Sequence, residues 1–371
     1  MFLSRRAFVV STLSTITLTP SLALATGMCP GVRAETGARP PLSIPSISPQ
    51  LPASRSIPTD WRRIALEIIA QFESGQRDID IAYGNVSKTD VISLGYLQWN
   101  HNAGSLYNRL LKDASEDMIS AAPPLVRDDI RRLARIGGDP KRKRELRAII
   151  TGWRTANDIK PDYKSALRSW LLSKAMRDRQ DELLDQRLQM ALRYADAWER
   201  DLGRATGGEN GERAFYTFVD LQVFNGDLAG LWVDHVRQYR NKFSSAIKML
   251  DDIAAWTKSC GEFKFQGKVG TGKEAYVPVY KKLYRRKETP LSVAEWQRMA
   301  REPNSALDEA TFELLALGYL RASISNGNDA PNGFHGVFEL DVLNRRGLVA
   351  TGRGVLPGQD RVTQLYVASR R

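Results

Sequence analysis

Apolar residues recur every three or four positions in the stretch that begins at Trp61. They are Trp61, Ile64, Ala65, Ile68, Ile69 and Phe72. This spacing matches the 3.6-residue period of a helix that buries one face. Thr59 or Asp60 can cap the first turn, and Gly75 is well placed to end the helix. The pattern therefore predicts a helix that ends near Gly75, with Glu73 at the edge of its apolar stripe.

The same period predicts helices along most of the remaining chain, so the fold class expected is mainly α. The expected segments are 104–111, two or three short helices within 114–164, one long helix or a broken pair over 165–202, and then 213–231, 233–256 and 291–320. Polar residues 76–92 predict a short hairpin or an irregular loop. Residues 321–371 contain Gly, Asn and short apolar runs, and predict a loop with one or two strands.

Residues 1–25 have the three parts of an export signal peptide. Arg5 and Arg6 form a basic head, an apolar run rich in Ser and Thr follows, and Ala23-Leu24-Ala25 is a small-x-small cleavage site. The head is similar to a twin-arginine signal, and an ordinary Sec signal remains open. No later apolar run is long enough to cross a bilayer. We therefore expect a periplasmic or secreted protein without stable membrane insertion after signal removal.

The next segment, residues 26–58, contains seven prolines with interspersed serines. This composition is typical of an extended linker that buries no core. Residues 59–371 are then expected to form the folded domain. Within it, residues 258–290 are rich in Lys, Gly and Tyr, and predict a short hairpin or a basic sub-lobe.

The chain is basic, with 54 Lys and Arg against 42 Asp and Glu and a formal net charge of +12. Loss of the two signal-peptide arginines lowers this to +10. The excess favours an anionic partner such as an acidic wall polymer, a membrane surface or nucleic acid. Only three His and two Cys are present, so neither a metal site nor a cofactor is expected. Whether Cys29 pairs with Cys260 stays open.

Two short motifs carry the candidate chemistry. Glu73-Ser74 closes the first predicted helix, and Gly95-Tyr96-Leu97-Gln98 follows about twenty residues later, ahead of Trp99 and Asn100. Glu73 would lie at the negative end of the helix dipole and be partly buried. Both effects favour the neutral carboxyl, which is the form that a general acid needs.

These motifs resemble those of the lysozyme superfamily over residues 60–111. Goose-type lysozymes and soluble lytic transglycosylases carry a Glu-Ser at a helix end and a Gly-x-x-Gln turn about twenty residues later. Bacterial chitosanases of the same superfamily look similar and place an Asp a little under twenty residues after the Glu, where Asp90 stands here. The resemblance implies an α+β lysozyme-like fold that is mainly α, with two helical lobes and a small β element beside the cleft.

The resemblance also implies roles for single residues. Glu73 would protonate the glycosidic oxygen as it leaves. Asp90 would activate a water in an inverting reaction, with Asp78 and Asp80 as alternatives; with no base in place, the substrate's own groups would close the reaction. Trp99 could equally be a core residue under the turn. The side chains expected to line the sugar subsites are Ser74, Tyr96, Gln98, Trp99 and Asn100.

The function predicted is cleavage of a β-1,4-linked amino-sugar polymer. Peptidoglycan carries carboxylates and chitosan carries ammonium groups, so a net charge of +10 favours the former as substrate. A chitosanase-like hydrolase is the alternative. A non-catalytic cell-wall glycan-binding protein is the alternative of another class. Nucleic acid is not an expected partner, because basic residues are interspersed with acids and no DNA-binding motif is present.

Overall fold

The computed structural model divides the chain into two compact units. Of the described residues, unit 1 holds 55–190 and 223–225, and unit 2 holds 48–54, 191–222 and those from 228 onward. The sequence predicts one domain over 59–371. The boundary between the units falls after Met190, inside a continuous helix, so the hydrophobic periodicity of the sequence does not reveal it. The structure describes residues 48–88, 91–101, 104–137, 139–156, 158–225, 228–262, 288–302, 307–324 and 337–367.

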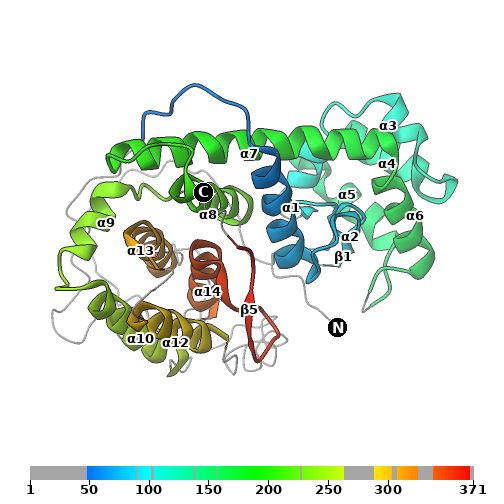
Figure 1. Ribbon diagram of the computed structural model, residues 1–371. Coiled ribbons are helices and arrows are strands. Elements are labelled where there is room, and N and C mark those ends of the chain that lie inside the picture. The colour runs from blue at the N-terminus through cyan, green and yellow to red at the C-terminus, as the bar shows by residue number, and fades with distance from the viewer. Residues whose placement is uncertain are drawn as a thin grey trace, which may run out of the picture. The chain divides into compact units, whose positions relative to one another are not determined.

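Unit 1 is mainly helical, as predicted (Figure 1). Its short strands β1 (Val86–Ser87), β2 (Ser93–Leu94) and β3 (Trp99–Asn100) form an antiparallel sheet in that order. Val86 lies opposite Leu94, which in turn lies opposite Trp99. The helices are α1 (Thr59–Ser74), α2 (Ile79–Tyr83), the π-helix η2 (Leu106–Leu110), α3 (Glu116–Ser120), α4 (Pro124–Ile136), the 3-10 helix η3 (Pro140–Arg142), α5 (Lys143–Gly152), α6 (Pro161–Leu171) and the first part of α7 (Lys174–Asp201).

Helix α1 buries the stripe that its sequence predicts. Trp61, Ala65, Ile68 and Ile69 are buried, and Gly75 ends the helix in the left-handed region with φ of 77°. Its N–H donates to the Gln71 carbonyl at 3.0 Å. A glycine adopts this backbone conformation without steric cost. The predicted cap is wrong, because Pro58 occupies the cap position and no side chain hydrogen-bonds to the first turn.

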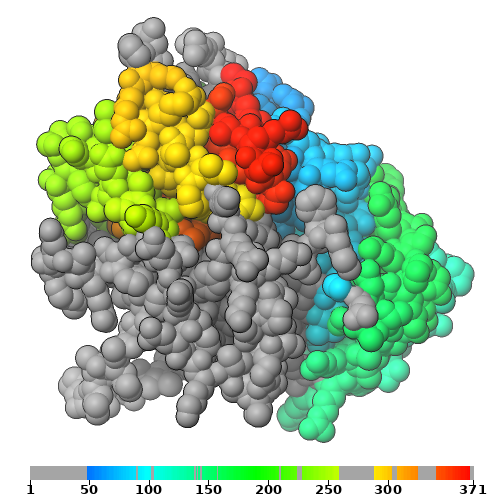
Figure 2. All heavy atoms as spheres, turned by 90° about the horizontal axis from the view of Figure 1, so that it is seen from below, coloured from blue at the N-terminus to red at the C-terminus, as the bar shows by residue number. Residues whose placement is uncertain are grey.

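Unit 2 is a helical assembly with one hairpin. Strands β4 (Arg353–Val355) and β5 (Val362–Gln364) pair antiparallel, with Arg353 opposite Gln364. The hairpin and α12 lie side by side at the surface, in red and yellow in Figure 2. The helices are the end of α7, α8 (Glu209–Asp220), the π-helix η4 (Leu221–Asn225), α9 (Val233–Arg240), α10 (Ala246–Glu262), α12 (Glu288–Arg301), α13 (Glu309–Ser323) and α14 (Val337–Thr351).

Helix α14 corrects the prediction of a loop with strands over 321–371. The two strands exist, but a fully packed helix precedes them and lies against α13 (Figure 1). Gly347, part of the reason for predicting a loop, lies in its middle. A Cβ at this position would approach within 1.9 Å of the Trp296 ring. Glycine is therefore present to let two helices approach closely, and not to bend the chain.

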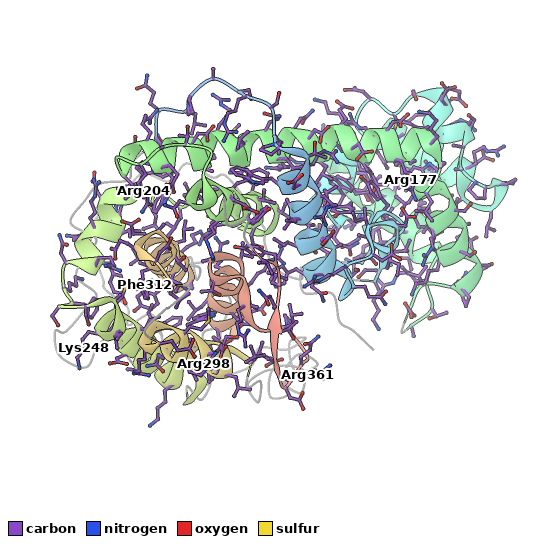
Figure 3. All side chains as sticks on the ribbon, in the orientation of Figure 1. Arg177, Arg204, Lys248, Arg298, Phe312 and Arg361 are labelled. Carbon is purple, nitrogen blue, oxygen red and sulfur yellow. The ribbon has the colours of Figure 1, made fainter. Side chains whose placement is uncertain are left out.

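Charged side chains are also buried in unit 2. Arg345 of α14 pairs with Asp220 of α8, and both are almost fully buried. Arg204, labelled in Figure 3, pairs with Glu199 at 2.8 Å and with Glu313 at 2.6 Å. Burial raises the pKa of both carboxyls, although the guanidinium opposes this shift. Paired charges of this kind make the packing specific more than they add stability.

The end of the predicted linker is docked onto a helix. Arg193 of α7 donates to the Pro52 carbonyl at 2.8 Å, and Arg200 donates to the Gln50 carbonyl at 3.0 Å. Extended backbone without internal hydrogen bonds offers its carbonyls to such donors. The predicted export signal, most of the linker and nearly all of the 258–290 segment lie outside the described residues, as do Cys29 and the Cys260 side chain. Among the described residues, no helix is long and apolar enough to cross a bilayer.

Candidate active site

Glu73 occupies the last turn of α1 and is buried, with 8% of the residue exposed. Its neighbour Ser74 completes the helix end. The Ser74 hydroxyl donates to the Ala70 carbonyl at 2.7 Å and accepts from the Gln76 N–H at 3.3 Å. The hydroxyl is thus engaged in local hydrogen bonds at the end of the helix. Ser74 was predicted to contact substrate, and the structure gives it this local role.

The Gly-x-x-Gln segment is the turn that joins β2 to β3. The Gln98 N–H donates to the Gly95 carbonyl at 3.1 Å, and the Gln98 Nε2 donates to the same oxygen at 2.9 Å. Gly95 and Gln98 both have positive φ, of 71° and 48°. One carbonyl therefore receives a backbone and a side-chain donor, which makes the turn a closed and rigid unit.

Asn85 connects the two motifs. Its side-chain Nδ2 donates to the Glu73 carbonyl at 3.4 Å, and its own carbonyl accepts the Gly95 N–H at 2.8 Å. The Tyr96 hydroxyl also donates to the Leu66 carbonyl in α1. The structure thus places the turn against the helix that carries Glu73. Sequence reasoning did not single out Asn85, which follows the short helix α2 in the segment predicted as a loop or hairpin.

Helix α7 hydrogen-bonds to the Gly95–Gln98 turn and to helix α2. Gln180 is fully buried; its Oε1 accepts the Tyr96 N–H at 2.9 Å and its Nε2 donates to the Leu171 carbonyl at 2.9 Å. The next residue, Asp181, accepts from the Tyr83 hydroxyl of α2. Both side chains of α7 therefore fix elements of the candidate site. The sequence gives no signal for Gln180, which lies 84 positions after Tyr96.

The three acids considered as the catalytic base are Asp78, Asp80 and Asp90, and the structure describes the first two. Asp78 caps α2, because its Oδ1 accepts the N–H groups of Asp80 at 2.9 Å and Ile81 at 3.2 Å. Asp80 forms an ion pair of 2.7 Å with Arg177 of α7, which is labelled in Figure 3. Asp90, the first choice, lies outside the described residues. Both runners-up thus already have structural partners.

The turn residues face inward, which contradicts part of the predicted binding surface. Tyr96 and Gln98 are fully buried, and the Tyr96 ring lies 4.9 Å from that of Tyr83. Trp99 is 3% exposed and lies under the turn, since a Cβ on Gly95 would be 3.0 Å from its ring. A buried ring offers no face to a sugar. These residues position the turn; Asn100, also buried, donates its N–H to the Ser105 hydroxyl at 2.8 Å.

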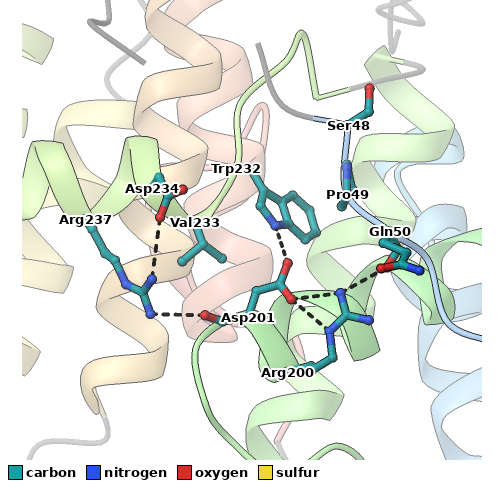
Figure 4. Close-up of a pocket in the computed structure, with 9 residues that line it drawn as sticks. All are labelled: Ser48, Pro49, Gln50, Arg200, Asp201, Trp232, Val233, Asp234 and Arg237. Carbon is teal, nitrogen blue, oxygen red and sulfur yellow. Dashed lines mark hydrogen bonds and ion pairs between the residues drawn. The ribbon is translucent and has the colours of Figure 1, made fainter. Parts of the chain in front are cut away.

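Two cavities lie elsewhere. One, of about 360 Å³, is in unit 1 beside Tyr107, Lys112 and Gly137. The other, of about 440 Å³, is in unit 2 between the linker and the ends of α7 and α9 (Figure 4). There Asp201 accepts from Trp232 Nε1 at 2.7 Å and pairs with Arg200 at 2.8 Å. Asp201 is thus already partnered in the unit 2 cavity, and Glu73 lines neither of the two cavities.

No group of three or more His, Cys, Asp or Glu side chains that could hold a metal ion exists among the described residues. A reaction without metal or cofactor stays a prediction. No protein-family model, curated protein or solved structure matches this chain. The resemblance to the lysozyme superfamily therefore depends on the motif residues alone.

Proposed function

We propose that the protein is a lysozyme-like glycosidase that cleaves a β-1,4-linked amino-sugar polymer, with peptidoglycan as substrate and Glu73 as general acid. The main support is the link between Glu73, Asn85 and the Gly95–Gln98 turn. An acid at a helix end and a rigid turn, 22 residues apart in sequence, share one bridging residue. A catalytic acid needs a supporting frame of this kind, because it must hold its geometry to a fraction of an ångström.

In this reaction Glu73 donates its proton to the glycosidic oxygen as the bond to the anomeric carbon breaks. The acid must be neutral when substrate binds. Positive charge then develops on the sugar ring. A nucleophile must capture that carbon, either a water or a group of the substrate itself.

The choice between these nucleophiles depends on the second carboxylate. Asp78 and Asp80 have structural partners, so we exclude both from the catalytic role. Asp90 remains the candidate base for an inverting hydrolysis. Without it, an oxygen or amide of the substrate closes the reaction intramolecularly, as in lytic transglycosylases. An inverting chitosanase-like enzyme would need Asp90.

Product masses test the proposal and separate these outcomes. Purified mature protein is incubated with peptidoglycan and, separately, with chitosan, beside the variants Glu73→Gln and Asp90→Asn. Hydrolysis adds one water for each bond cleaved, whereas transglycosylation adds no water and yields anhydro ends. We expect the wild type to release peptidoglycan fragments, and Glu73→Gln to release them about 10²–10⁴-fold more slowly. If wild type binds the polymer and releases no fragments, glycan binding without catalysis replaces the proposal.

A further inference from the structure

The positive charge of unit 1 is concentrated in one segment. Residues 55–190 contain 24 Lys and Arg against 19 Asp and Glu, and residues 127–147 alone contain nine against four. The segment therefore carries the whole excess of five charges, and the remainder of 55–190 is balanced. Evenly interspersed surface charges would not concentrate the positive excess in one segment. The concentration creates a strong local positive potential.

The segment folds as α4, η3 and α5, with its apolar residues turned inward. Val126, Ile130, Leu133 and Ile136 of α4 are buried, as are Leu146 and Ile150 of α5. The two helices are joined by Arg132, which forms an ion pair of 2.7 Å with Glu145. Their charged residues are thereby left on the outer side.

The acids of this segment are all engaged. Asp128 pairs with Arg131, Asp129 accepts from Trp153 Nε1, Asp139 accepts the Lys141 N–H, and Glu145 pairs with Arg132 and Arg142. The two guanidinium groups hold the pKa of Glu145 below its usual value, chiefly through their hydrogen bonds. Asp128 and Glu145 are thus ion-paired, and Asp129 and Asp139 are held by neutral N–H donors, so the segment keeps its excess of five positive charges.

Three of the nine cations are ion-paired, Arg127 donates to the Ala122 carbonyl at 2.9 Å, and the Lys143 side chain lies outside the described residues. We name the other four the basic face: Arg135, Lys141, Arg144 and Arg147. All are exposed, and none forms an ion pair within the described parts of the chain. Arg135 lies three residues after Arg132 on α4, and Arg147 lies three residues after Arg144 on α5. Like charges at this helical spacing are neighbours and destabilise one another, which a bound anion would relieve.

We propose that the basic face binds a carboxylate-bearing glycan strand and holds the polymer that Glu73 cleaves. Three of its four side chains are guanidinium groups, whose planar forks match carboxylates. Helices α4 and α5 contain no aromatic residue on which bases could stack. Their outer side exposes one large apolar residue, Leu125, too little for insertion into a bilayer. The choice of glycan depends on the proposed function of Glu73.

Binding is measured with full-length mature protein carrying Glu73→Gln, so that no probe is cleaved. The probe is fluorescently labelled polygalacturonate, a soluble glycan with carboxylates, followed by anisotropy at several salt concentrations. The test variant carries R135Q, K141Q, R144Q and R147Q. The matched control carries R109Q, K112Q, K164Q and K174Q, four exposed cations of unit 1 outside the segment. Circular dichroism melts verify that both variants fold like the parent.

We expect the test variant to bind at least about tenfold more weakly at low salt, with a flatter dependence on salt, while the control changes about twofold or less. Equal weakening of both variants would overturn the proposal, because net charge and not the basic face would then explain binding. Tighter binding to single-stranded DNA or to phosphatidylglycerol vesicles, lost in the test variant, would assign the face to those partners. If the wild type does not cleave peptidoglycan, the proposed function is wrong. The binding measurements test the basic face alone.

Discussion

Gly95 is the residue whose substitution tests the geometry of the candidate site most sharply. Its φ of 71° costs any other residue about 1–2 kcal/mol. An added Cβ would also lie 2.4 Å from the Gln180 Oε1, an atom held by the Tyr96 N–H. Displacing that atom costs about 1–3 kcal/mol more. We therefore expect Gly95→Ala to lower the free energy of unfolding by about 2–5 kcal/mol.

Gly104→Ala is the matched control, because Gly104 has the same φ of 71° and its Cβ would meet only the tip of Asn108 at 3.2 Å. It should lose only the backbone part, about 1–2 kcal/mol. Urea unfolding followed by tryptophan fluorescence measures both variants. Adding Gln180→Ala to Gly95→Ala should cost less than the sum of the single changes. Equal losses for the two glycine variants, or additivity with Gln180→Ala, would refute the close approach.

Two further predictions concern unit 2. A Gly→Ala change inside a helix normally stabilises a protein by up to about 1 kcal/mol. Gly347→Ala should instead destabilise this protein by about 3 kcal/mol or more, because the added Cβ would lie 1.9 Å from the ring of buried Trp296. A urea unfolding midpoint above that of the wild type would contradict this. Hydrogen bonds from Arg298 and Arg353 lower the pKa of Glu295 against the opposing effect of its burial. Its contribution to stability is therefore complete above about pH 4.5 and is lost as pH falls through the lowered pKa. Glu295→Gln should flatten the loss of stability below pH 4.5, and parallel acid titrations of the two proteins would count against it.

The first helix and the turn between β2 and β3 could be predicted because local patterns dominate there. The stripe from Trp61 to Ile69 is buried as the 3.6-residue period requires, and Gly75 ends the helix. The Gly95–Gln98 motif predicts a turn, and the structure forms a β-hairpin around it. In each case the residues that decide the conformation lie within a few positions of one another.

Helix α14 shows where local patterns fail. Its polar residues Asn344, Arg345 and Arg346 are buried, so among the described residues of this helix polar positions do not mark a solvent-exposed face, which is the pattern that periodicity detects. Arg345 is satisfied by Asp220, 125 positions earlier in the chain. Gly347 is required by a Trp on another helix. Partners this distant are set by packing, which a single sequence does not display.

In the candidate site, too, some residues follow from local motifs and others from tertiary packing. The motif residues identify Glu73 and the turn, but the contacts that join them are made by Asn85 and Gln180, which belong to no motif. The inward orientation of Tyr96 and Gln98 also follows from tertiary packing. Sequence reasoning took these aromatic and amide side chains as sugar ligands because their chemistry suits that role. Burial decides between a ligand and a supporting residue, and a short motif does not encode burial.

The most direct test of Glu73 as the catalytic acid compares two Glu→Gln variants of α1. Glu73→Gln removes the proposed proton donor at the helix end. Glu67→Gln, the control, removes a carboxylate paired with Arg63 at 2.5 Å on the same helix. The rate of soluble fragment release from peptidoglycan is measured for each. We expect Glu73→Gln to lose about 10²–10⁴-fold in rate and Glu67→Gln to stay within about twofold of wild type. Wild-type rates in Glu73→Gln would remove this residue from the chemistry and the glycosidase proposal with it.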